Sequence, residues 1–429
     1  METFLIFFFF AALLAFRVPI AIAAGFASVI YMAITGIIPL DYAPLVAFQT
    51  LDRFALLAIP FFILAGQIMA VGGIAKKLLE LADEILGSLP GGYALTTVLA
   101  SVFFADLSGS GPGTVAAIGT LMIPAMKKQG YDLAFAAALS ASAGCLAVII
   151  PPSNPMIVYG IAGDTSIGRL FLAGFIPGIL FAIGLAIPAY YISKKNGWRG
   201  SRERGSFKSI LKATWRAKWA LLVPVIILGG IYSGIFTPTE SAAVASLYAL
   251  IVGLFIYREF TYRELPKIFR IAALNIVTIM LILSLVGLFG QVITLLGAPA
   301  KLAEALAGIS GNHPWLVLVL INVFLLFVGM IMDTMAAIIL LAPILLAVVV
   351  PMHVDPVHFG LIMIMNLAIG FLTPPVGVNL FVANTISNVS IRSIFWAARP
   401  FIIASLIVLT IVTYVPWLSL VVPNYFYGK

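Results

Sequence analysis

Two short segments that contain glycine and hydroxyl-bearing residues interrupt otherwise apolar stretches of this sequence. They are segment 106–113 (DLSGSGPG) and segment 329–334 (GMIMDT), and each is followed by a double proline, within 151–155 (PPSNP) and 373–379 (TPPVGVN). Proline removes a backbone N–H and frees a carbonyl group in a helix. Freed carbonyls beside hydroxyl and amide oxygens suit Na⁺, whereas the N-termini of half-helices favour an anionic carboxylate.

We therefore expect the two glycine-rich tips and the two double-proline breaks to form one central site flanked by two Na⁺ sites. The predicted substrate-binding residues are Ser108, Gly109, Ser110, Ser153, Asn154, Asp333, Thr334 and Asn379. The predicted Na⁺ sites draw on Ser108, Ser110, Gly144, Pro151, Gly329, Asp333, Thr334, Thr373 and Gly377. Because the tips and breaks contain no Lys or Arg, a carboxylate would be held there by backbone amides and hydroxyl groups. Plain proline kinks are the alternative interpretation of each break.

Two acids, Asp106 and Asp333, lie within apolar sequence, where ionisable residues are usually functional. The alternative is that they cap helices, and we favour capping for Asp333 because a helical arm begins near Thr334. For Asp106 both roles stay open. Glu240, in the stretch TPTE, indicates the start of a helix with an acid in its first turn.

The remaining polar residues have plainer interpretations. Arg53 and Arg169 are candidates to steer an anion or dock an acidic partner, although interface anchoring explains them as well. Helix packing accounts for Gln67, Asn275, Gln291 and Cys145, and the three histidines, His313, His353 and His358, are too scattered to indicate a metal site.

The composition is that of a membrane protein. Of 429 residues, 62% are hydrophobic and 9% are charged, whereas a soluble domain has about 25% charged residues. In lipid every backbone polar group needs an internal partner, and the apolar runs here are continuous rather than alternating, which predicts helices and not a β-barrel. The net charge of +8 is typical of basic cytoplasmic loops, not of a nucleic-acid partner. The N-terminus carries Glu2 and lacks the basic region of a cleavable signal.

A membrane span needs about 20 apolar residues. The predicted spans are 3–15, 18–36, 50–73, 131–162, 168–192, 217–234, 240–257, 272–296, 356–386 and 394–421. The first two are short, so 3–36 could instead form one bent helix. Region 93–126 is interpreted as a re-entrant helical hairpin, because its arms 93–105 and 114–126 are too short to cross about 30 Å at 1.5 Å per residue. Region 314–350 is interpreted in the same way only because it aligns with 93–126 in the repeat.

The two halves of the chain repeat. The GQ pair at 66–67 recurs 224 residues later at 290–291, and the double proline at 151–152 recurs 223 residues later at 374–375. Each half has about five spans, and an odd number inserts the second half upside down. Inverted repeats are a common plan of secondary transporters. Convergent use of glycine and proline is the alternative.

Charge predicts the orientation. The linker 193–216 is strongly basic with a single acid, Glu203, and such a segment should be cytoplasmic. Both termini are then periplasmic, and four of the 24 basic residues fall outside, namely Arg53, Arg169, Lys301 and Lys429. Segments 75–88, 298–309 and 259–270 have amphipathic patterns and are either interface helices or ordinary connectors.

Together with the family resemblance that the motifs below carry, these observations imply a division into two domains. The scaffold comprises 1–92 and 217–312, which are the first spans and arm of each repeat. The mobile transport domain comprises 93–192 and 313–429, which are the hairpin and the later helices of each repeat.

Four motifs carry a family resemblance. The segments SGSGP at 108–112, IPPS at 150–153, GIFTPTE at 234–240 and TPPVGVNLF at 373–381 resemble the large, DctM-type membrane subunit of tripartite ATP-independent periplasmic (TRAP) transporters, in order along essentially the whole chain. The resemblance implies the ion-transporter-superfamily elevator fold, with Na⁺ as the coupling ion and no cofactor. It also implies two partners, a small four-helix membrane subunit and a periplasmic substrate-binding protein. Since the chain starts directly at its first span, we expect the small subunit on a separate polypeptide.

The sequence thus predicts an all-α polytopic protein of the bacterial inner membrane, not an enzyme, that imports an organic anion by Na⁺ symport and an elevator movement. The alternatives are a stand-alone Na⁺- or H⁺-coupled anion symporter of the same fold class, a channel, and an intramembrane aspartyl hydrolase that needs Asp106 and Asp333 close together. Sialic acid, a C4-dicarboxylate, a sugar acid and ectoine are all open as substrates. We do not assume that Asp106 follows the sequence pattern of the family.

Overall fold

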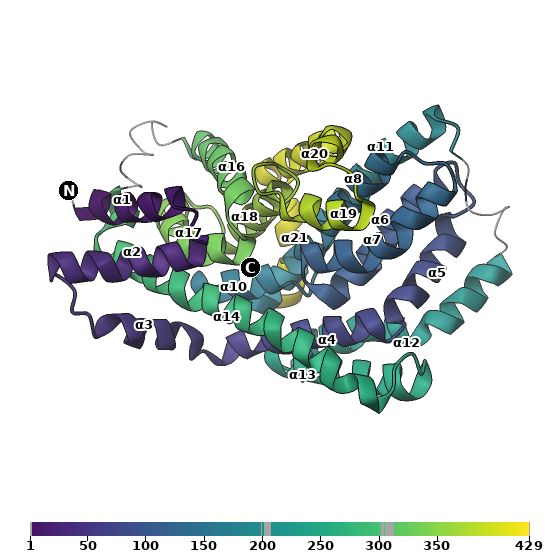
Figure 1. Cartoon of the computed structure of the whole chain (residues 1–429), viewed down its shortest axis with the longest axis horizontal. Helices are drawn as coiled ribbons and strands as arrows, with labels where there is room; N and C mark the ends of the chain where they lie inside the picture. The colour runs from purple at the N-terminus through teal and green to yellow at the C-terminus, as the bar shows by residue number, and fades with distance from the viewer. Residues whose placement is uncertain (1, 199, 201–206, 302–303, 305–312, 429) are drawn as a thin grey trace.

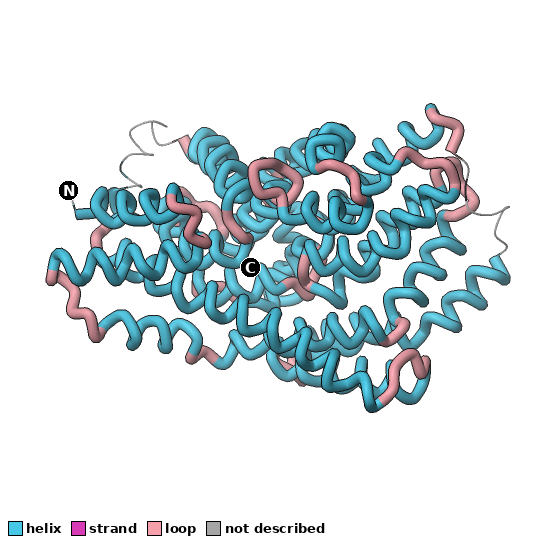
Figure 2. The backbone as a smooth tube through the Cα atoms, in the orientation of Figure 1, coloured by secondary structure: helices cyan, strands magenta, loops and turns pink. Residues whose placement is uncertain are grey.

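The computed structural model describes residues 2–428 except 199, 201–206, 302–303 and 305–312. All regular elements in these residues are helices (Figure 2). Among them, seven helices are long and apolar enough to cross a membrane, and a bent pair within 133–162 makes an eighth if it is one span. The prediction of an all-helical membrane protein is therefore confirmed.

The helices of the two halves follow each other in the same order. The first half contains α1 (Glu2–Ala15), α2 (Ile20–Thr35), α3 (Tyr42–Leu51), η1 (Phe54–Leu57), α4 (Ala58–Val71), α5 (Ile74–Leu86), α6 (Gly92–Ser108), α7 (Gly111–Lys128), α8 (Leu133–Gly144), α9 (Leu146–Ile149), α10 (Asn154–Ala162) and α11 (Ile167–Lys195). The second half contains α12 (Phe207–Tyr232), α13 (Pro238–Ile251), η2 (Val252–Ile256), η3 (Tyr262–Glu264), α14 (Leu265–Leu295), α16 (Pro314–Ile331), α17 (Thr334–Val349), α18 (Pro356–Gly370), α19 (Val378–Ser387), α20 (Ile391–Tyr414) and α21 (Trp417–Tyr427).

The correspondence is clearest where the chain forms hairpins and broken helices. The hairpin α6–α7 matches α16–α17, and the broken helix α8–α9–α10 matches α18–α19. Helix starts repeat in the same way. Asp132 caps α8 by accepting from the Phe135 N–H at 2.8 Å, and Asp355 caps α18 by accepting from the Val357 N–H at 2.7 Å. Side-chain oxygens at this position satisfy backbone N–H groups that have no partner within the helix.

The two halves interlock at the broken helices. α19 of the second half packs against α7 and α8 of the first, and α10 of the first half packs against α17 of the second. Between them, Cys145 Sγ donates to the Ala368 carbonyl at 3.1 Å, across a sequence separation of 223. That separation equals the repeat shift, so the hydrogen bond joins equivalent positions, as contacts at a two-fold axis do.

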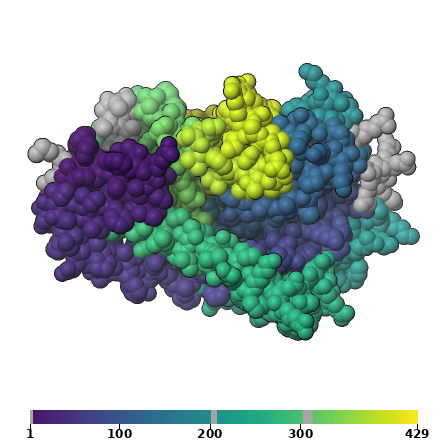
Figure 3. Space-filling view, viewed as in Figure 1, coloured from purple at the N-terminus to yellow at the C-terminus, as the bar shows by residue number. Residues whose placement is uncertain are grey.

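The helices form two groups. In Figure 1, α3, α4, α13 and α14 run along the lower long side, whereas α16, α18, α19 and α20 lie along the upper side. In the first group α13 packs on α4, and α14 packs on α2 and α3. In the space-filling view, the green helices α13 and α14 cross the face below the yellow C-terminal helices (Figure 3). The first group contains helices of the predicted scaffold, and the second contains helices of the predicted transport domain.

Helices extend further than predicted at the first hairpin. α6 ends at Ser108 and α7 begins at Gly111, so the arms have 17 and 18 residues instead of 13. Ser110 as N-cap and Pro112 near the helix start allow α7 to begin inside the glycine-rich segment. The arms still fall short of the roughly 20 residues that a span requires.

Both ends of the predicted basic linker 193–216 are helical, because α11 continues to Lys195 and α12 begins at Phe207. The predicted bounds of the linker are therefore wrong. α12 buries Ala213 and Ala217 and packs against α5 and α13. An alanine stripe between lysines makes this segment an amphipathic helix rather than a loop.

Several predicted spans have different bounds. α1 and α2 pack against each other, so a single bent helix over 3–36 is wrong. The span 50–73 is divided at Asp52–Arg53, and 394–421 is divided before Pro416, which cannot continue a helix without loss of a hydrogen bond. Segment 75–88 is the amphipathic α5, and 259–270 is η3 with the start of α14. Most of 298–309 falls outside the described residues.

Two glycines set the closest approach of the second hairpin to its broken helix. A Cβ at Gly370 would lie 2.3 Å from the carbonyl carbon of Gly329, and a Cβ at Gly329 would lie 3.1 Å from Leu367 Cα. Both obstacles are backbone atoms, which side-chain rotation cannot remove. α16 and α18 therefore depend on the absence of side chains here.

We predict that Gly370→Ala lowers the thermal unfolding midpoint of the detergent-solubilised protein by several degrees, because the two backbones must move apart at a cost of about 1–3 kcal/mol. Gly229→Ala in α12 is the matched control, since an added Cβ there meets nothing within 4 Å. It should leave the midpoint unchanged or slightly raised, because Ala favours the helix over Gly. Equal midpoints for both variants would contradict this packing argument.

Candidate functional site

The tip of the first hairpin is a two-residue turn. Gly109 ends α6 in the left-handed conformation (φ 54°), and Ser110 begins α7 by accepting from the Gly113 N–H at 3.4 Å. Ser108 Oγ lies 2.6 Å from Thr114 Oγ1. The tip thus presents hydroxyl groups and a bare backbone turn, and a side chain at Gly109 would be strained by the positive φ.

The first break lies directly against this tip. A Cβ at Gly109 would lie 3.2 Å from the Asn154 backbone N, at the start of α10. Both side-chain polar atoms of Asn154 are buried without a hydrogen-bond partner. The neighbouring Ser153 is different, because its Oγ donates to the Val148 carbonyl at 2.7 Å. Asn154 is therefore the residue of this break whose polar atoms are available to a ligand.

The second break also reaches the first hairpin. Asn379 Nδ2 donates to the Ala141 carbonyl at 2.9 Å, whereas its Oδ1 is buried and unpartnered. A Cβ on Gly111 would lie 3.1 Å from that Oδ1, and a Cβ on Gly144 would lie 2.9 Å from the Gly111 carbonyl oxygen. Asn379, Gly111 and Gly144 therefore pack closely together, and the unpartnered Oδ1 of Asn379 lies beside Gly111.

The tip of the second hairpin is built differently. Asp333 accepts from the Met335 N–H at 2.9 Å and caps α17, so its predicted capping role is confirmed. The adjacent Thr334 is buried and its Oγ1 has no partner. The Val376 N–H donates to the Met330 carbonyl at 3.1 Å and ties the tip to the second break.

The other predicted ion ligands lie close to this second tip or at the first break. Thr373 Oγ1 donates to the Ile369 carbonyl at 3.5 Å, and Gly377 begins α19 with a positive φ of 53°. Gly329 is pressed against α18. Pro151 is buried, and its Cδ lies 3.2 Å from a Cβ at Gly174 in α11. Pro151 and Gly329 therefore determine the local backbone geometry, and only their carbonyl groups could bind an ion.

A cavity of about 420 Å³ lies between these elements and helices α4 and α14. Its walls include Ser108, Ser110 and Asn154 from the predicted transport domain, and Met335 at the start of α17. Opposite them lie Gln67 and Asn275, which sequence analysis took for helix-packing residues. The structure corrects that interpretation, and the repeated GQ pair was the signal that marked Gln67.

The electrostatics of the cavity come from helix ends. α7, α10, α17 and α19 all begin at a tip or a break, and α6, α9, α16 and α18 end there. Helix N-termini carry partial positive charge and C-termini carry partial negative charge. No charged side chain lines the cavity among the described residues. The arrangement can therefore hold an anion at N-terminal amides and small cations at C-terminal carbonyls.

The remaining predicted residues are placed elsewhere. Asp106 lies in the last turn of α6, caps no helix, and forms no hydrogen bond or ion pair with a described residue. Glu240 forms a capping box with Thr237, as predicted. Arg169 donates to Asn424 Oδ1 at 3.0 Å, which ties it to α21.

A second hollow of about 240 Å³ is related to the first by the repeat. It is lined by Gln291, the counterpart of Gln67, together with Ile339 and Leu340 in the middle of α17. Helix α4 thus meets the first hairpin at its tip, near Gly66, but α14 meets the second hairpin well beyond its tip, near Gly290. The two halves have the same elements, but their hairpins make unequal contacts with α4 and α14.

Comparison with known proteins adds a family model and relatives. The model described as "Tripartite ATP-independent periplasmic transporter, DctM component" matches residues 7–418. The isethionate TRAP transporter permease protein DctMQ of Oleidesulfovibrio alaskensis is 47% identical over 98% of this chain, which spans 65% of that relative. The C4-dicarboxylate TRAP transporter large permease protein DctM of Pseudomonas aeruginosa is 41% identical over 88% of each chain. The sialic acid TRAP transporter large permease protein SiaM of Vibrio cholerae is 36% identical over 96% of each.

A solved structure shares the architecture. The Alcanivorax borkumensis YdaH transporter superposes with a TM-score of 0.60 and covers 90% of both chains, at 11% sequence identity. At that identity the likeness concerns the fold alone.

Proposed function

Because this chain belongs to the family of DctM components of tripartite ATP-independent periplasmic transporters, we propose that it couples the entry of Na⁺ to the import of a small organic anion. Family membership makes it the large permease subunit of an organic-acid transporter in the inner membrane. One observation carries the proposal. The half-helices α7, α10 and α17 begin, and α6 ends, at a cavity whose walls, in the described residues, carry no charged side chain.

The substrate class follows from this cavity and from the relatives. Isethionate, C4-dicarboxylates and sialic acid, named for three relatives, are all organic anions. In this chain the anion binds at the N-termini of α7 and α10, where Ser110 and Asn154 line the cavity. A small membrane subunit and a periplasmic binding protein complete the transporter, and the binding protein does most of the selection among anions.

Two Na⁺ ions occupy the spaces between tips and breaks. The first is held by oxygens of Ser108, Gly144 and Asn379, and the second by oxygens of Asp333, Thr334 and Thr373. Unpartnered buried oxygens on Asn379 and Thr334 support this assignment, since such atoms are costly unless a ligand satisfies them. Two cations with a monoanion move net positive charge inward, and each charge gains about 2.3 kcal/mol per 100 mV.

The unequal contacts of the two hairpins support an elevator movement. In the opposite state of the elevator, Gly290 would contact the tip of the second hairpin, as Gly66 now contacts the tip of the first. Gly290 now contacts Ile339 and Leu340, about five residues of α17 from that tip. At 1.5 Å per residue this is about 8 Å. With the basic ends cytoplasmic and both termini periplasmic, the present arrangement is the inward-facing state, because the 420 Å³ cavity lies beside the cytoplasmic halves of α4 and α14.

The test of function is uptake into proteoliposomes that contain this chain and its small membrane subunit. Isethionate, succinate and sialic acid would be offered with and without an inward Na⁺ gradient and the binding protein. We expect uptake of one anion that requires both. Uptake without the binding protein would show a stand-alone symporter instead, and uptake that is indifferent to the gradient would contradict Na⁺ coupling.

Thr334→Val tests the second Na⁺ site. The hydroxyl has no partner, so its loss should leave the thermal midpoint unchanged or raised. If Thr334 binds Na⁺, the Na⁺ concentration for half-maximal uptake should rise at least about tenfold. This corresponds to a loss of about 1.4 kcal/mol in the free energy of Na⁺ binding. The matched control is Thr96→Val in α6, whose buried Oγ1 is also unpartnered but lies far from the tip in sequence. Equal Na⁺ dependence of both variants would exclude Thr334 as a ligand.

Paired cysteines test the elevator movement, in a chain whose native Cys145 is buried. Gln67→Cys with Ser108→Cys joins positions that line the same cavity now. Its repeat equivalent, Gln291→Cys with Ile331→Cys, should cross-link when Na⁺ and substrate let the domain move outward. Both cross-links should arrest uptake, and reduction should restore the uptake of the same variant before cross-linking, measured at saturating Na⁺ because Ser108→Cys itself removes a proposed Na⁺ ligand. A second pair that never cross-links in an actively transporting protein would contradict the proposed displacement.

A further inference from the structure

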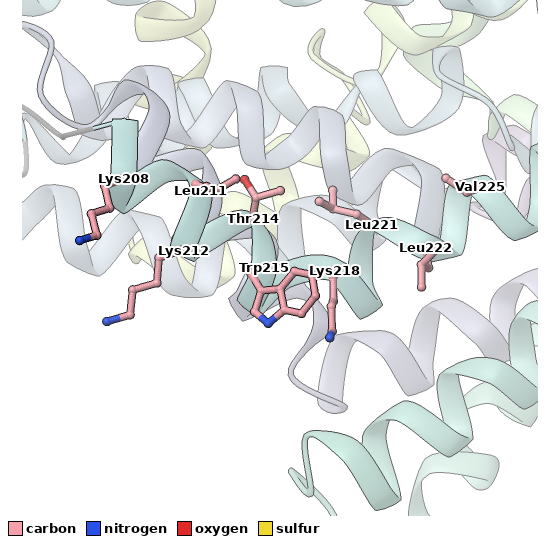
Figure 4. A pocket seen from close by; sticks show the side chains of 9 residues that line it. All are labelled: Lys208, Leu211, Lys212, Thr214, Trp215, Lys218, Leu221, Leu222 and Val225. Atoms are coloured by element: carbon pink, nitrogen blue, oxygen red, sulfur yellow. The ribbon is translucent and has the colours of Figure 1, made fainter.

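We propose that the exposed face of α12 binds an anionic phospholipid of the cytoplasmic leaflet. The face borders a hollow of about 860 Å³ lined by nine residues of this helix, namely Lys208, Leu211, Lys212, Thr214, Trp215, Lys218, Leu221, Leu222 and Val225. Figure 4 shows Lys208, Lys212, Trp215 and Lys218 projecting to the same side of the helix. The inference is independent of the substrate and of Na⁺ coupling.

Charge on this face is unbalanced. The 26 residues of α12 contain no Asp or Glu. Neither Lys208, Lys212 nor Lys218 forms an ion pair with a described residue. Lysines near anionic lipid headgroups strengthen membrane binding and fix the orientation of a segment. Among the described residues these three lysines have no ion-pair partner, and a phosphate group would supply one.

The aromatic residue on this face marks the depth of the headgroups. Trp215 is 70% exposed, and Lys218 Nζ lies 3.8 Å from the centroid of its ring. Tryptophan is enriched where the membrane meets water. At 1.5 Å per residue, α12 is about 39 Å long and exceeds a hydrocarbon core of about 30 Å. Its first two turns, with Lys208 and Lys212, therefore reach headgroup level.

The rest of the face suits acyl chains. Beyond Lys218 the hollow is lined by Leu222 and Val225, and Val225 is 62% exposed. The opposite face of α12 is already occupied, because Ala213, Ala217 and Ala220 are buried and α12 packs on α5 and α13. A lipid with its phosphate at Lys208 and Lys212 and its chains along Leu222 would cover the face from end to end.

A lipid fits this face better than a second protein does. Lysine is depleted from protein–protein interfaces, and three lysines without acids would have to be desolvated against a helix of the small membrane subunit. An anionic lipid satisfies their charge while the lysine stems cover its apolar part. The small subunit is the occupant that the experiment must exclude.

The experiment uses the fluorescence of Trp215. The full-length chain in neutral detergent is titrated with brominated phosphatidylglycerol or brominated phosphatidylcholine, and the signal of Trp215→Phe is subtracted. We expect quenching by phosphatidylglycerol at a concentration at least about tenfold lower than by phosphatidylcholine. Equal quenching by both lipids would overturn the proposal.

Variants assign the effect to the lysines. The triple variant Lys208→Gln, Lys212→Gln, Lys218→Gln should lose the preference for phosphatidylglycerol, and the corresponding triple Arg variant should keep it. The matched control is Lys194→Gln with Lys195→Gln at the end of α11, which does not line the hollow and should bind as the unmodified chain. A preference that survives the triple Gln variant would overturn the proposal. Quenching that disappears when the small membrane subunit is added would assign the face to that subunit instead.

Discussion

Backbone groups at the ends of half-helices, placed inside an apolar layer, are the constraint on which this structure depends. Lipid offers no hydrogen bonds, so irregular backbone is tolerated there only where protein or a cavity surrounds it. Here several of these backbone groups form hydrogen bonds with residues at the tips and breaks. Ser110 and Asp333 cap α7 and α17, Ser153 donates to the Val148 carbonyl, and the Val376 N–H donates to the Met330 carbonyl.

The oxygens that remain give the site its chemistry. Asn154, Asn379 and Thr334 are buried with polar atoms that no protein group satisfies. They lie at the starts of the half-helices α10, α19 and α17. The residues that stabilise the tips and breaks and the residues with unpartnered polar atoms are thus neighbours, which supports the proposed binding of ions and an anion at this site.

The interlocked halves make this site rigid, whereas its contact with the scaffold is unequal. Each broken helix packs on the hairpin of the other half, so the tips and breaks cannot separate without disrupting both repeats. Gly66 adjoins the tip of the first hairpin, but Gly290 adjoins the middle of α17. A rigid body that meets two equivalent surfaces at different heights is suited to sliding between them. A lipid held by α12 would fix the depth of the surface that stays still.

The sequence by itself determined the helical membrane class, the repeat, the two tips and the two breaks, because each depends on local chemistry. Apolar runs must form helices in lipid, proline ends them, and an acid at the start of a helix takes part in its cap, as at Asp333 and Glu240. Only the tertiary structure decided which oxygens are free. Sequence could not separate Asn154 from Ser153, or show that Asn379 reaches Ala141 and that Gln67 faces the cavity, because these depend on contacts between segments far apart in the chain. It also placed the lysines of 207–216 in a linker, since their helix is stabilised by packing of Ala213 and Ala217, which a charge pattern does not reveal.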